Sequence, residues 1–269
     1  MKKRFNTLSL QEQYIYRHHL EHRTITFLRF FMLLVFLCLW EIASRLGWID
    51  SFFFSSPSMV YGCFMELLTV KALHEHILIT LAETIISFLF VMLLSFLSAF
   101  LLWFFPKAER CLEPFLVVLN SLPKSALAPL IMVWIGTGIK TVILCGMSVA
   151  IFGSILSFYT SFHEADTDKL LLIRTLNGNR IQQFLYVVFP GSMPELLNCA
   201  KVNIGLTLVG VIIGEFLAAK KGLGYLIIYG SQVFQLNLVI TSIMLLCLMA
   251  MLLYQIMEFF LHYYKKHKG

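Results

Sequence analysis

Six apolar stretches of membrane length dominate this 269-residue chain and restrict the folds open to it. Each approaches the roughly 20 mostly apolar residues that a helix needs to cross the hydrocarbon core of a bilayer. Hydrophobic residues make up 59% of the sequence and charged residues only 13%, about half the share of a soluble domain. The sequence therefore predicts an all-α integral membrane protein and disfavours aqueous enzymes and nucleic-acid binding. The predicted spans are residues 27–43, 81–105, 112–135, 141–162, 202–219 and 238–261.

The third predicted span is interrupted by Asn120, Ser121, Pro123, Lys124 and Pro129. We expect a kinked span that faces the bundle interior, because neighbouring helices or water then satisfy the freed carbonyl groups. Asn120, Ser121 and Lys124 are candidates for lining a translocation path, where Lys124 offers an anion one positive charge. The alternative is that Lys124 snorkels to the interface or hydrogen-bonds the broken backbone.

The fifth predicted span carries Asn203, Thr207 and Glu215. Asn203 and Thr207 are one helical turn apart, so they share a face that suits either helix–helix hydrogen bonds or a pore wall. Glu215 falls near the outer end of the span. There we expect it to pair with Lys220 or Lys221.

Orientation follows from the basic residues. Of the 21 Lys and Arg residues, 14 are counted on the side of the amino terminus and five on the other side. The positive-inside rule then places both termini in the cytoplasm.

Residues 1–26 form a basic segment, read as an interfacial helix or a loosely ordered tail. Residues 27–261 form the six-span domain, and residues 262–269 form a basic tail. About 25 polar residues precede the first span, so we expect no cleavable signal peptide.

A long polar segment, residues 163–201, separates the fourth and fifth spans and is predicted to be cytoplasmic. Asn177-Gly178-Asn179 breaks it into two pieces, and Pro190 is expected to end the second piece. A helix–turn–helix of this kind indicates a docking site for a partner, and the alternative is a helix resting on lipid headgroups. Its apolar residues recur at steps of three to five, which predicts an amphipathic surface helix. They are Ile173, Leu176, Ile181, Phe184, Leu185 and Val188.

Several short motifs, in this order and spacing, resemble a known family. They are Ser56-Pro57-Ser58-Met59-Val60, Leu122-Pro123-Lys124-Ser125-Ala126-Leu127-Ala128-Pro129-Leu130, Trp134-Ile135-Gly136-Thr137-Gly138, Gly214-Glu215-Phe216-Leu217 and Lys221-Gly222-Leu223-Gly224-Tyr225-Leu226-Ile227. From about Trp40 to its end the chain is similar to the membrane-spanning subunit of type I ABC importers, in the branch that includes sulfonate, nitrate and taurine permeases. A short helix over residues 59–68 is expected after the first motif.

The resemblance implies that residues 163–201 contain a coupling helix for a separate ATPase. Alignment on Pro190 places Leu171-Leu172-Ile173 where the family has Glu-Ala-Ala, so the acidic residue is missing. A second departure is the Ser and Phe residues that replace glycine in residues 87–105, which argues against close helix packing there. The implied coupling residues are Arg174, Thr175, Leu176, Asn177, Gly178, Asn179, Arg180 and Pro190.

No phosphate-binding glycine loop occurs, so ATP hydrolysis is assigned to a partner chain and no cofactor to this one. The resemblance implies an ABC ATPase dimer, a second permease subunit and an extracytoplasmic solute-binding protein in a bacterial inner membrane. The implied substrate is a small anion of the sulfonate, nitrate or taurine kind, or a thiamine-precursor pyrimidine. A diverged non-transporting scaffold and an ion-coupled secondary transporter are the alternatives. His74-Glu75-His76 is the only His/acid cluster, and a solvated loop rather than a metal site is expected there.

Overall fold

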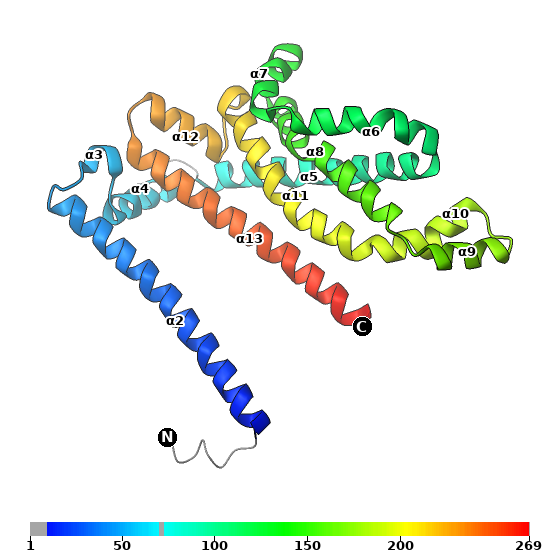
Figure 1. Ribbon diagram of the computed structural model, residues 1–269. Coiled ribbons are helices and arrows are strands. Elements are labelled where there is room, and N and C mark those ends of the chain that lie inside the picture. The colour runs from blue at the N-terminus through cyan, green and yellow to red at the C-terminus, as the bar shows by residue number, and fades with distance from the viewer. Residues whose placement is uncertain (1–9, 70–72, 269) are drawn as a thin grey trace. The chain divides into compact units, whose positions relative to one another are not determined.

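A computed structural model describes residues 10–69 and 73–268, and every regular element in these ranges is helical (Figure 1). The chain divides into two compact units, Met1–Phe64 and Met65–Gly269. The helices are α2 Leu10–Arg45, α3 Ser51–Phe54, α4 Pro57–Thr69, α5 Leu73–Phe104, α6 Pro106–Ser121, α7 Lys124–Ile135, α8 Ile139–His163, α9 Thr167–Thr175, α10 Arg180–Gln183, the π-helix η1 Phe184–Val188, α11 Phe189–Ala218, α12 Leu223–Gln232 and α13 Leu236–Lys268.

Five of the described helices are long and apolar enough to cross a membrane, and a sixth span results if α6 and α7 count as one. The α6–α7 pair is bent by 96° at residues 122–123, which confirms the predicted break in the third span. The fifth span does not begin near residue 202 as predicted, because the helix is continuous from Arg180 to Ala218. Lys201, near the middle of this helix, forms an ion pair with Glu258 of α13.

In the amino-terminal unit, α2 contains both residues 10–26 and the first predicted span in one helix, while residues 1–9 lie outside the described part. The carboxylate of Glu41 accepts hydrogen bonds from the Ser58 backbone at 3.1 Å and the Ser58 hydroxyl at 3.0 Å. Arg45 donates to the same carboxylate at 2.6 Å. Glu41 therefore joins the end of α2 to the start of α4, and α4 confirms the short helix predicted over residues 59–68.

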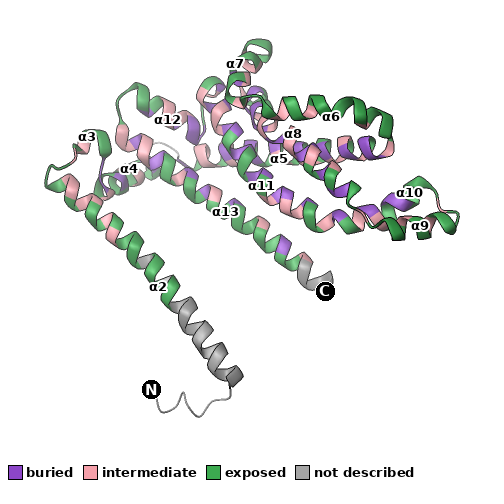
Figure 2. Cartoon of the chain, in the orientation of Figure 1, coloured by how far each residue is buried: buried purple, intermediate pink, exposed green. Residues whose placement is uncertain are grey.

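In the second unit, α8 packs along both α5 and α11, and the buried residues of these helices face one another (Figure 2). Small residues allow the α8–α11 contact. A Cβ atom on Gly210 would lie 2.7 Å from the Cys145 carbonyl oxygen, and one on Gly214 would lie 2.8 Å from the Cα of Val142. Glycine at these positions lets the two backbones approach, as in other membrane helix pairs.

Close packing also occurs between α5 and α8, where the loss of glycine suggested otherwise. The hydroxyl of Ser87 donates to the Ile143 carbonyl at 3.2 Å, and that of Ser95 to the Ile151 carbonyl at 3.3 Å. Serine is small enough for the approach and adds an interhelical hydrogen bond, so it replaces glycine without separating the helices.

Candidate functional site

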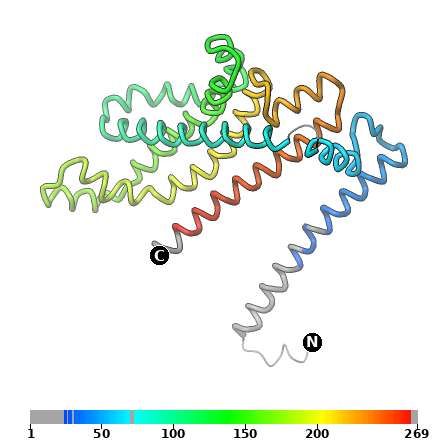
Figure 3. Tube along the Cα trace, turned by 180° about the vertical axis from the view of Figure 1, so that it is seen from behind, coloured from blue at the N-terminus to red at the C-terminus, as the bar shows by residue number. Residues whose placement is uncertain are grey.

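The helices α9 and α10 form a small lobe at the opposite end of the second unit from α12, as the two views show (Figures 1 and 3). Asp166 begins this lobe by accepting hydrogen bonds from the backbone N–H groups of Asp168 and Lys169, at 3.0 and 3.3 Å. The Lys169 side chain lies 3.1 Å from the same carboxylate. The Lys169 side chain and these backbone donors hold the pKa of Asp166 below its usual value. The polar start of the segment thus encodes a helix N-cap.

The turn after α9 satisfies the orphan carbonyl groups of the helix end. The N–H of Gly178 donates to the Ile173 carbonyl at 2.8 Å, and the N–H of Asn177 to the Arg174 carbonyl at 3.0 Å. This is the Schellman arrangement, and its left-handed residue is Asn177, with φ of 60°. Gly178 is needed for another reason, because a Cβ there would collide with the Ile173 side chain and carbonyl.

Asn179 and Gln182 then form a capping box that starts α10, each side chain bonding to the other's backbone N–H at 2.8 Å. Arg180, in the first turn of α10, reaches back to the end of α5. Its Nη2 donates to the Trp103 carbonyl at 3.3 Å, and its guanidinium lies 5.4 Å from the Trp103 ring centroid and 5.5 Å from that of Phe104. Arg180 therefore fixes the position of the lobe on the bundle.

Pro190 does not end the second helical piece, and that prediction was wrong. The π-helix η1 precedes it, and the N–H of Phe189 donates to the Phe184 carbonyl, five residues back. Pro190 follows in the first turn of α11, where a missing N–H is tolerated. The lobe is thus continuous with a membrane-spanning helix, and single-turn π-bulges of this kind are frequent at functional positions.

Phe184 anchors η1 in an aromatic cluster at this end of the bundle. Its ring centroid lies 4.7 Å from that of Phe100, 5.3 Å from Trp103 and 5.2 Å from Phe162. Phe184 and Val188 are buried, one turn apart on the same face. Phe184 therefore packs η1 against the ends of α5 and α8.

The side chains of the predicted amphipathic stripe do not all point the same way. Phe184 and Val188 point into the bundle, and Ile173 is half-buried, whereas Leu176, Ile181 and Leu185 are exposed. Leu172 is 59% and Leu176 74% exposed, and the two are one turn apart on α9. An apolar face on a polar lobe indicates a protein contact. The exposed apolar face consists of Leu171, Leu172, Leu176, Ile181 and Leu185.

At the break in the third span, the Lys124 ammonium donates to the carbonyl of Asn120 in the last turn of α6. The hydroxyl of Ser121 donates to the Val117 carbonyl at 2.9 Å. Both contacts match the alternative in which polar side chains satisfy the interrupted backbone. The side chain of Asn120 lies towards Gly153 of α8, where a Cβ would be 3.3 Å from its Oδ1.

Asn203 and Thr207 are both buried. The amide of Asn203 donates to Cys199 Sγ at 3.2 Å and to Met92 Sδ of α5 at 3.8 Å, and the Thr207 hydroxyl donates to the Asn203 carbonyl. These contacts match the helix-packing alternative for this pair.

Glu215 does not pair with a lysine, because Lys221 is bound to Glu75 instead. Its carboxylate is buried and accepts from the Thr80 hydroxyl at 2.6 Å and from the Gly224 backbone at 2.5 Å. Thr80 in turn accepts from the Leu223 backbone at 2.8 Å. Three helices, α5, α11 and α12, therefore meet around one carboxylate.

Two neighbours of this corner were not predicted. Glu83 of α5 is buried beside Glu215, and the sequence signal was an acidic residue inside a strongly apolar run. His76 of α5 lies with its Nδ1 about 3 Å from the backbone N and O of Gly222. His74-Glu75-His76 thus forms the first turn of a helix and not a loop, and the described residues contain no group of three or more potential metal ligands.

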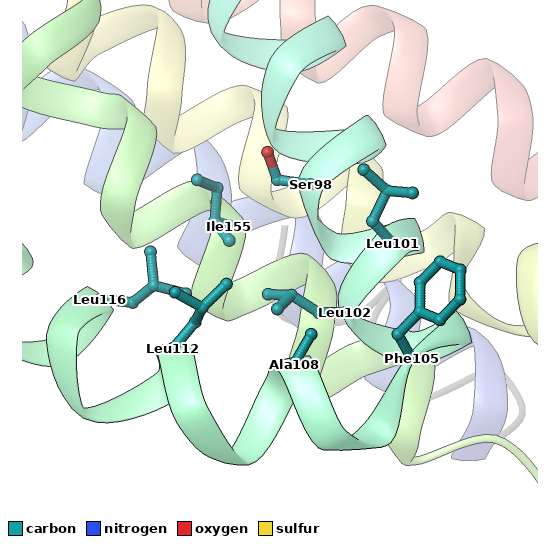
Figure 4. A pocket seen from close by; sticks show the side chains of 8 residues that line it. All are labelled: Ser98, Leu101, Leu102, Phe105, Ala108, Leu112, Leu116 and Ile155. Carbon is teal, nitrogen blue, oxygen red and sulfur yellow. The ribbon is translucent and has the colours of Figure 1, made fainter.

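An apolar cavity of about 440 Å³ lies between α5, α6 and α8 (Figure 4). Ser98 is its one hydroxyl-bearing residue. A charged solute would find few polar contacts there, so this cavity is not a match for a small anion. The other lining residues are Leu101, Leu102, Phe105, Ala108, Leu112, Leu116 and Ile155.

The chain is a bundle of membrane-length helices with a capped helical lobe between two of them. Residues 91–267, more than half of the chain, match the family model described as binding-protein-dependent transport system inner membrane component, and the chain belongs to this family. It is therefore the non-catalytic permease component of an ABC transporter, a multi-pass inner-membrane protein that works with ATPase and binding-protein partners. Membership of this family decides against an ion-coupled secondary transporter.

An ABC transporter permease protein of Haemophilus influenzae is 27% identical over 229 residues, which cover 85% of this chain and 92% of that protein. The riboflavin transport system permease protein RibX of Chloroflexus aurantiacus is 26% identical, over 82% of this chain and 83% of that protein. The inward-facing MetNI methionine ABC transporter is similar in fold, with a TM-score of 0.64 at 20% identity over 72% of this chain and 96% of that one.

Proposed function

We propose that this permease forms the translocation path of an ATP-driven importer and that the α9–α10 lobe receives the movement of the ATPase. The observation that carries the proposal is the exposed apolar face, which lies on a lobe fixed to two spans. Leu171 and Leu172 occupy the positions of the family's Glu and Ala. An apolar contact with the ATPase then replaces the charged one, so the missing acidic residue changes the chemistry of docking but does not remove it.

In this proposal the polar residues of the lobe have two roles, contact with the ATPase and stabilisation of the turn. They are Arg174, Thr175, Asn177 and Asn179. Arg174 is exposed on α9 and is available to the partner, whereas Thr175, Asn177 and Asn179 hold the shape of the turn through backbone hydrogen bonds. The ATPase closes on ATP binding, and a lobe of fixed shape passes that movement to η1 and the aromatic cluster.

The test is co-purification of the full chain with its ATPase from a membrane extract. Replacing both Leu172 and Leu176 by Ala removes the centre of the exposed apolar face, and the recovered ATPase should fall at least tenfold. Asp168→Ala is the matched control, because Asp168 is exposed on the same helix but outside that face. Equal recovery from the double variant and the control would contradict docking on this face. Recovery of no ATPase with the wild type would favour a scaffold subunit.

We also propose that both termini and the lobe face the cytoplasm, with residues 1–26 and 262–269 as basic flanks of the six-span domain. The distribution of Lys and Arg supports this orientation, and an even number of spans returns the chain to the same side. Reporter fusions after Lys268 and within residues 220–222 test it. The first should be active only with a cytoplasmic reporter, and the second only with an exported one.

For the substrate, we propose a small anion such as a sulfonate, nitrate or taurine, with a thiamine-precursor pyrimidine as the second candidate. Relatives at 23 to 26% identity carry names that specify aliphatic sulfonates, taurine, formylaminopyrimidine and riboflavin. The Lys124 ammonium and the polar groups of Asn120 and Ser121 are the candidates for the path, whereas the burial of Asn203 and Thr207 favours helix packing for that pair. Uptake of labelled taurine by proteoliposomes that contain the whole importer, with each unlabelled solute as competitor, distinguishes the two substrate classes.

A further inference from the structure

Two buried carboxyl groups touch at the α12 end of the bundle. Glu83 of α5 is 3% exposed and Glu215 of α11 is 1% exposed, and their side chains are hydrogen-bonded to each other. An ionised carboxyl group can only accept hydrogen bonds. A bond between two carboxyl groups therefore requires a proton on one of them. We refer to Glu83 and Glu215 as the carboxyl pair.

Glu215 is the ionised member, because the protein surrounds it with donors. It accepts from the Thr80 hydroxyl and from the backbone N–H groups of Gly224 and Tyr225. The two backbone donors belong to the first turn of α12, where the helix dipole favours a negative charge. A Cβ on Gly222 or Gly224 would collide with this carboxylate, so the backbone is built closely around it.

Glu83 is the protonated member. Its Oε2 is buried and has no hydrogen-bond partner within the described residues. An unpartnered oxygen costs far less free energy on a neutral carboxylic acid than on a carboxylate. The contact places one proton on the carboxyl pair, and the orphaned oxygen, a separate observation, favours Glu83 as the residue that carries it.

Among the described residues, no cation is placed to neutralise the pair. Lys221 is bound to Glu75 and is exposed, and His76 is bound to the backbone of Gly222. Other charged or titratable groups on or next to the elements packed around the pair include Lys124 of α7, Lys140, Cys145, Tyr159 and His163 of α8, Glu195, Cys199 and Lys201 of α11, Lys220, Tyr225 and Tyr229 near or on α12, and Cys247, Tyr254, Glu258 and His262 of α13. None of them has a hydrogen bond or ion pair to Glu83 or Glu215, apart from the backbone of Tyr225.

We infer that the carboxyl pair is a proton-binding site in which Glu83 holds one exchangeable proton at neutral pH and donates it to Glu215. The proton ties α5 to the corner between α11 and α12. Its loss leaves two buried anions in contact, and their repulsion separates α5 from that corner. The Leu223–Thr80 hydrogen bond crosses the same contact and would break with it.

Infrared spectroscopy of the full chain in lipid nanodiscs tests the inference directly. The wild type should show the carbonyl band of a protonated carboxylic acid at about pH 7, where ordinary carboxyl groups are ionised. Glu83→Gln should abolish the band. Glu75→Gln, on the same helix but exposed and paired with Lys221, should leave it unchanged. A wild type without the band, or a band that survives in Glu83→Gln, overturns the inference.

Thermal unfolding between about pH 7 and about pH 9.5 gives a second readout that does not depend on spectral assignment. The folded protein holds a proton that the unfolded chain releases, so the stability of the wild type should fall as the pH rises. Glu83→Gln should flatten this dependence relative to Glu75→Gln, and it should be tolerated because glutamine mimics a protonated acid. Glu215→Gln should be clearly less stable. Equal losses of stability in Glu83→Gln and Glu215→Gln overturn the inference. Disappearance of the infrared band on addition of sodium or calcium ions at neutral pH also overturns it.

Discussion

The guanidinium of Arg180 lies 5.4 Å from the ring centroid of Trp103 and donates a hydrogen bond to the Trp103 carbonyl, across 77 positions of the sequence. A carbonyl at the end of a helix carries partial negative charge, so this position suits a cation. The planar group also covers the neighbouring ring of Phe104. A residue of the α9–α10 lobe thus contacts the end of a membrane-length helix, and this contact ties the lobe to α5.

Arg180→Ala should therefore uncouple the lobe from the bundle. The lost cation–π contact and hydrogen bond are expected to destabilise the chain by about 1 kcal/mol. Arg180→Lys should recover only part of the effect, because an ammonium lacks the planar fork. The measurement is thermal unfolding in detergent together with the ATPase rate of the reconstituted importer. Arg174→Ala removes the same charge from α9, and a stability loss of equal size in that variant would contradict an anchoring role for Arg180.

The geometry of the turn after α9 predicts different effects for substitutions at two neighbouring positions. Gly178→Ala forces a Cβ into the Ile173 side chain and carbonyl, and overpacking of this kind costs about 1–3 kcal/mol. Asn177→Gly should be neutral, because glycine accepts the left-handed conformation that Asn177 already has. Limited proteolysis of the lobe should be faster in the first variant only. Faster cleavage of Asn177→Gly would show that the Asn side chain, and not the backbone conformation, holds the turn.

Phe184→Ala should be the most damaging single change at this end of the bundle. Phe184 is 4% exposed and packs against five rings, so truncation leaves a cavity that costs about 3–5 kcal/mol. Leu185→Ala, the adjacent exposed position, should leave thermal unfolding of the isolated chain unchanged. A small effect of Phe184→Ala would mean that the aromatic cluster collapses around the gap and does not transmit a rigid displacement.

Acidification should weaken the start of α9. The side chain of Lys169 and the backbone N–H groups hold the pKa of Asp166 below its usual value. The stabilisation is therefore present above the usual Asp value of about 4 and is lost as the pH falls through the lower, folded-state pKa. Hydrogen exchange at Asp168 and Lys169 across this acidic range measures the effect. Asp166→Asn keeps a capping oxygen without the charge, so the protection of these amides, relative to the intrinsic exchange rate at each pH, should not change in that range.

Five membrane-length helices, the break at Pro123 in the third predicted span and the presence of a helical lobe could all be predicted, because hydropathy, proline and Asn-Gly signals act over a few neighbouring residues. The continuation of the fifth span to Arg180 could not. Pro190 is an ordinary stop signal, and only a π-helix supported by the burial of Phe184 lets the helix continue through it.

The contacts of charged residues were the weakest part of the prediction. Glu215 has Lys220 and Lys221 a few residues away, yet it bonds to Thr80, 135 positions distant. The expectation that Glu215 pairs with a lysine close in sequence fails because the corner between α11 and α12 turns the lysines outward, where Lys221 forms an ion pair with Glu75. Partners of this kind depend on which helices become neighbours, and a single sequence carries little information about that arrangement.

Helix packing in the membrane gives the last prediction. Gly210 and Gly205 lie on α11, but only Gly210 faces α8, where a Cβ would lie 2.7 Å from the Cys145 carbonyl and 2.8 Å from the Gly146 Cα. Backbone atoms cannot move aside as a side chain does, so Gly210→Ala should separate the helices and cost about 1–3 kcal/mol. Nothing lies within 4 Å of a Cβ on Gly205, and Gly205→Ala should be neutral or stabilising by up to about 1 kcal/mol through helix propensity. Thermal unfolding of the two variants in the same detergent separates a packing effect from a general response to alanine. Equal melting temperatures would mean that α8 and α11 do not approach closely at Gly210.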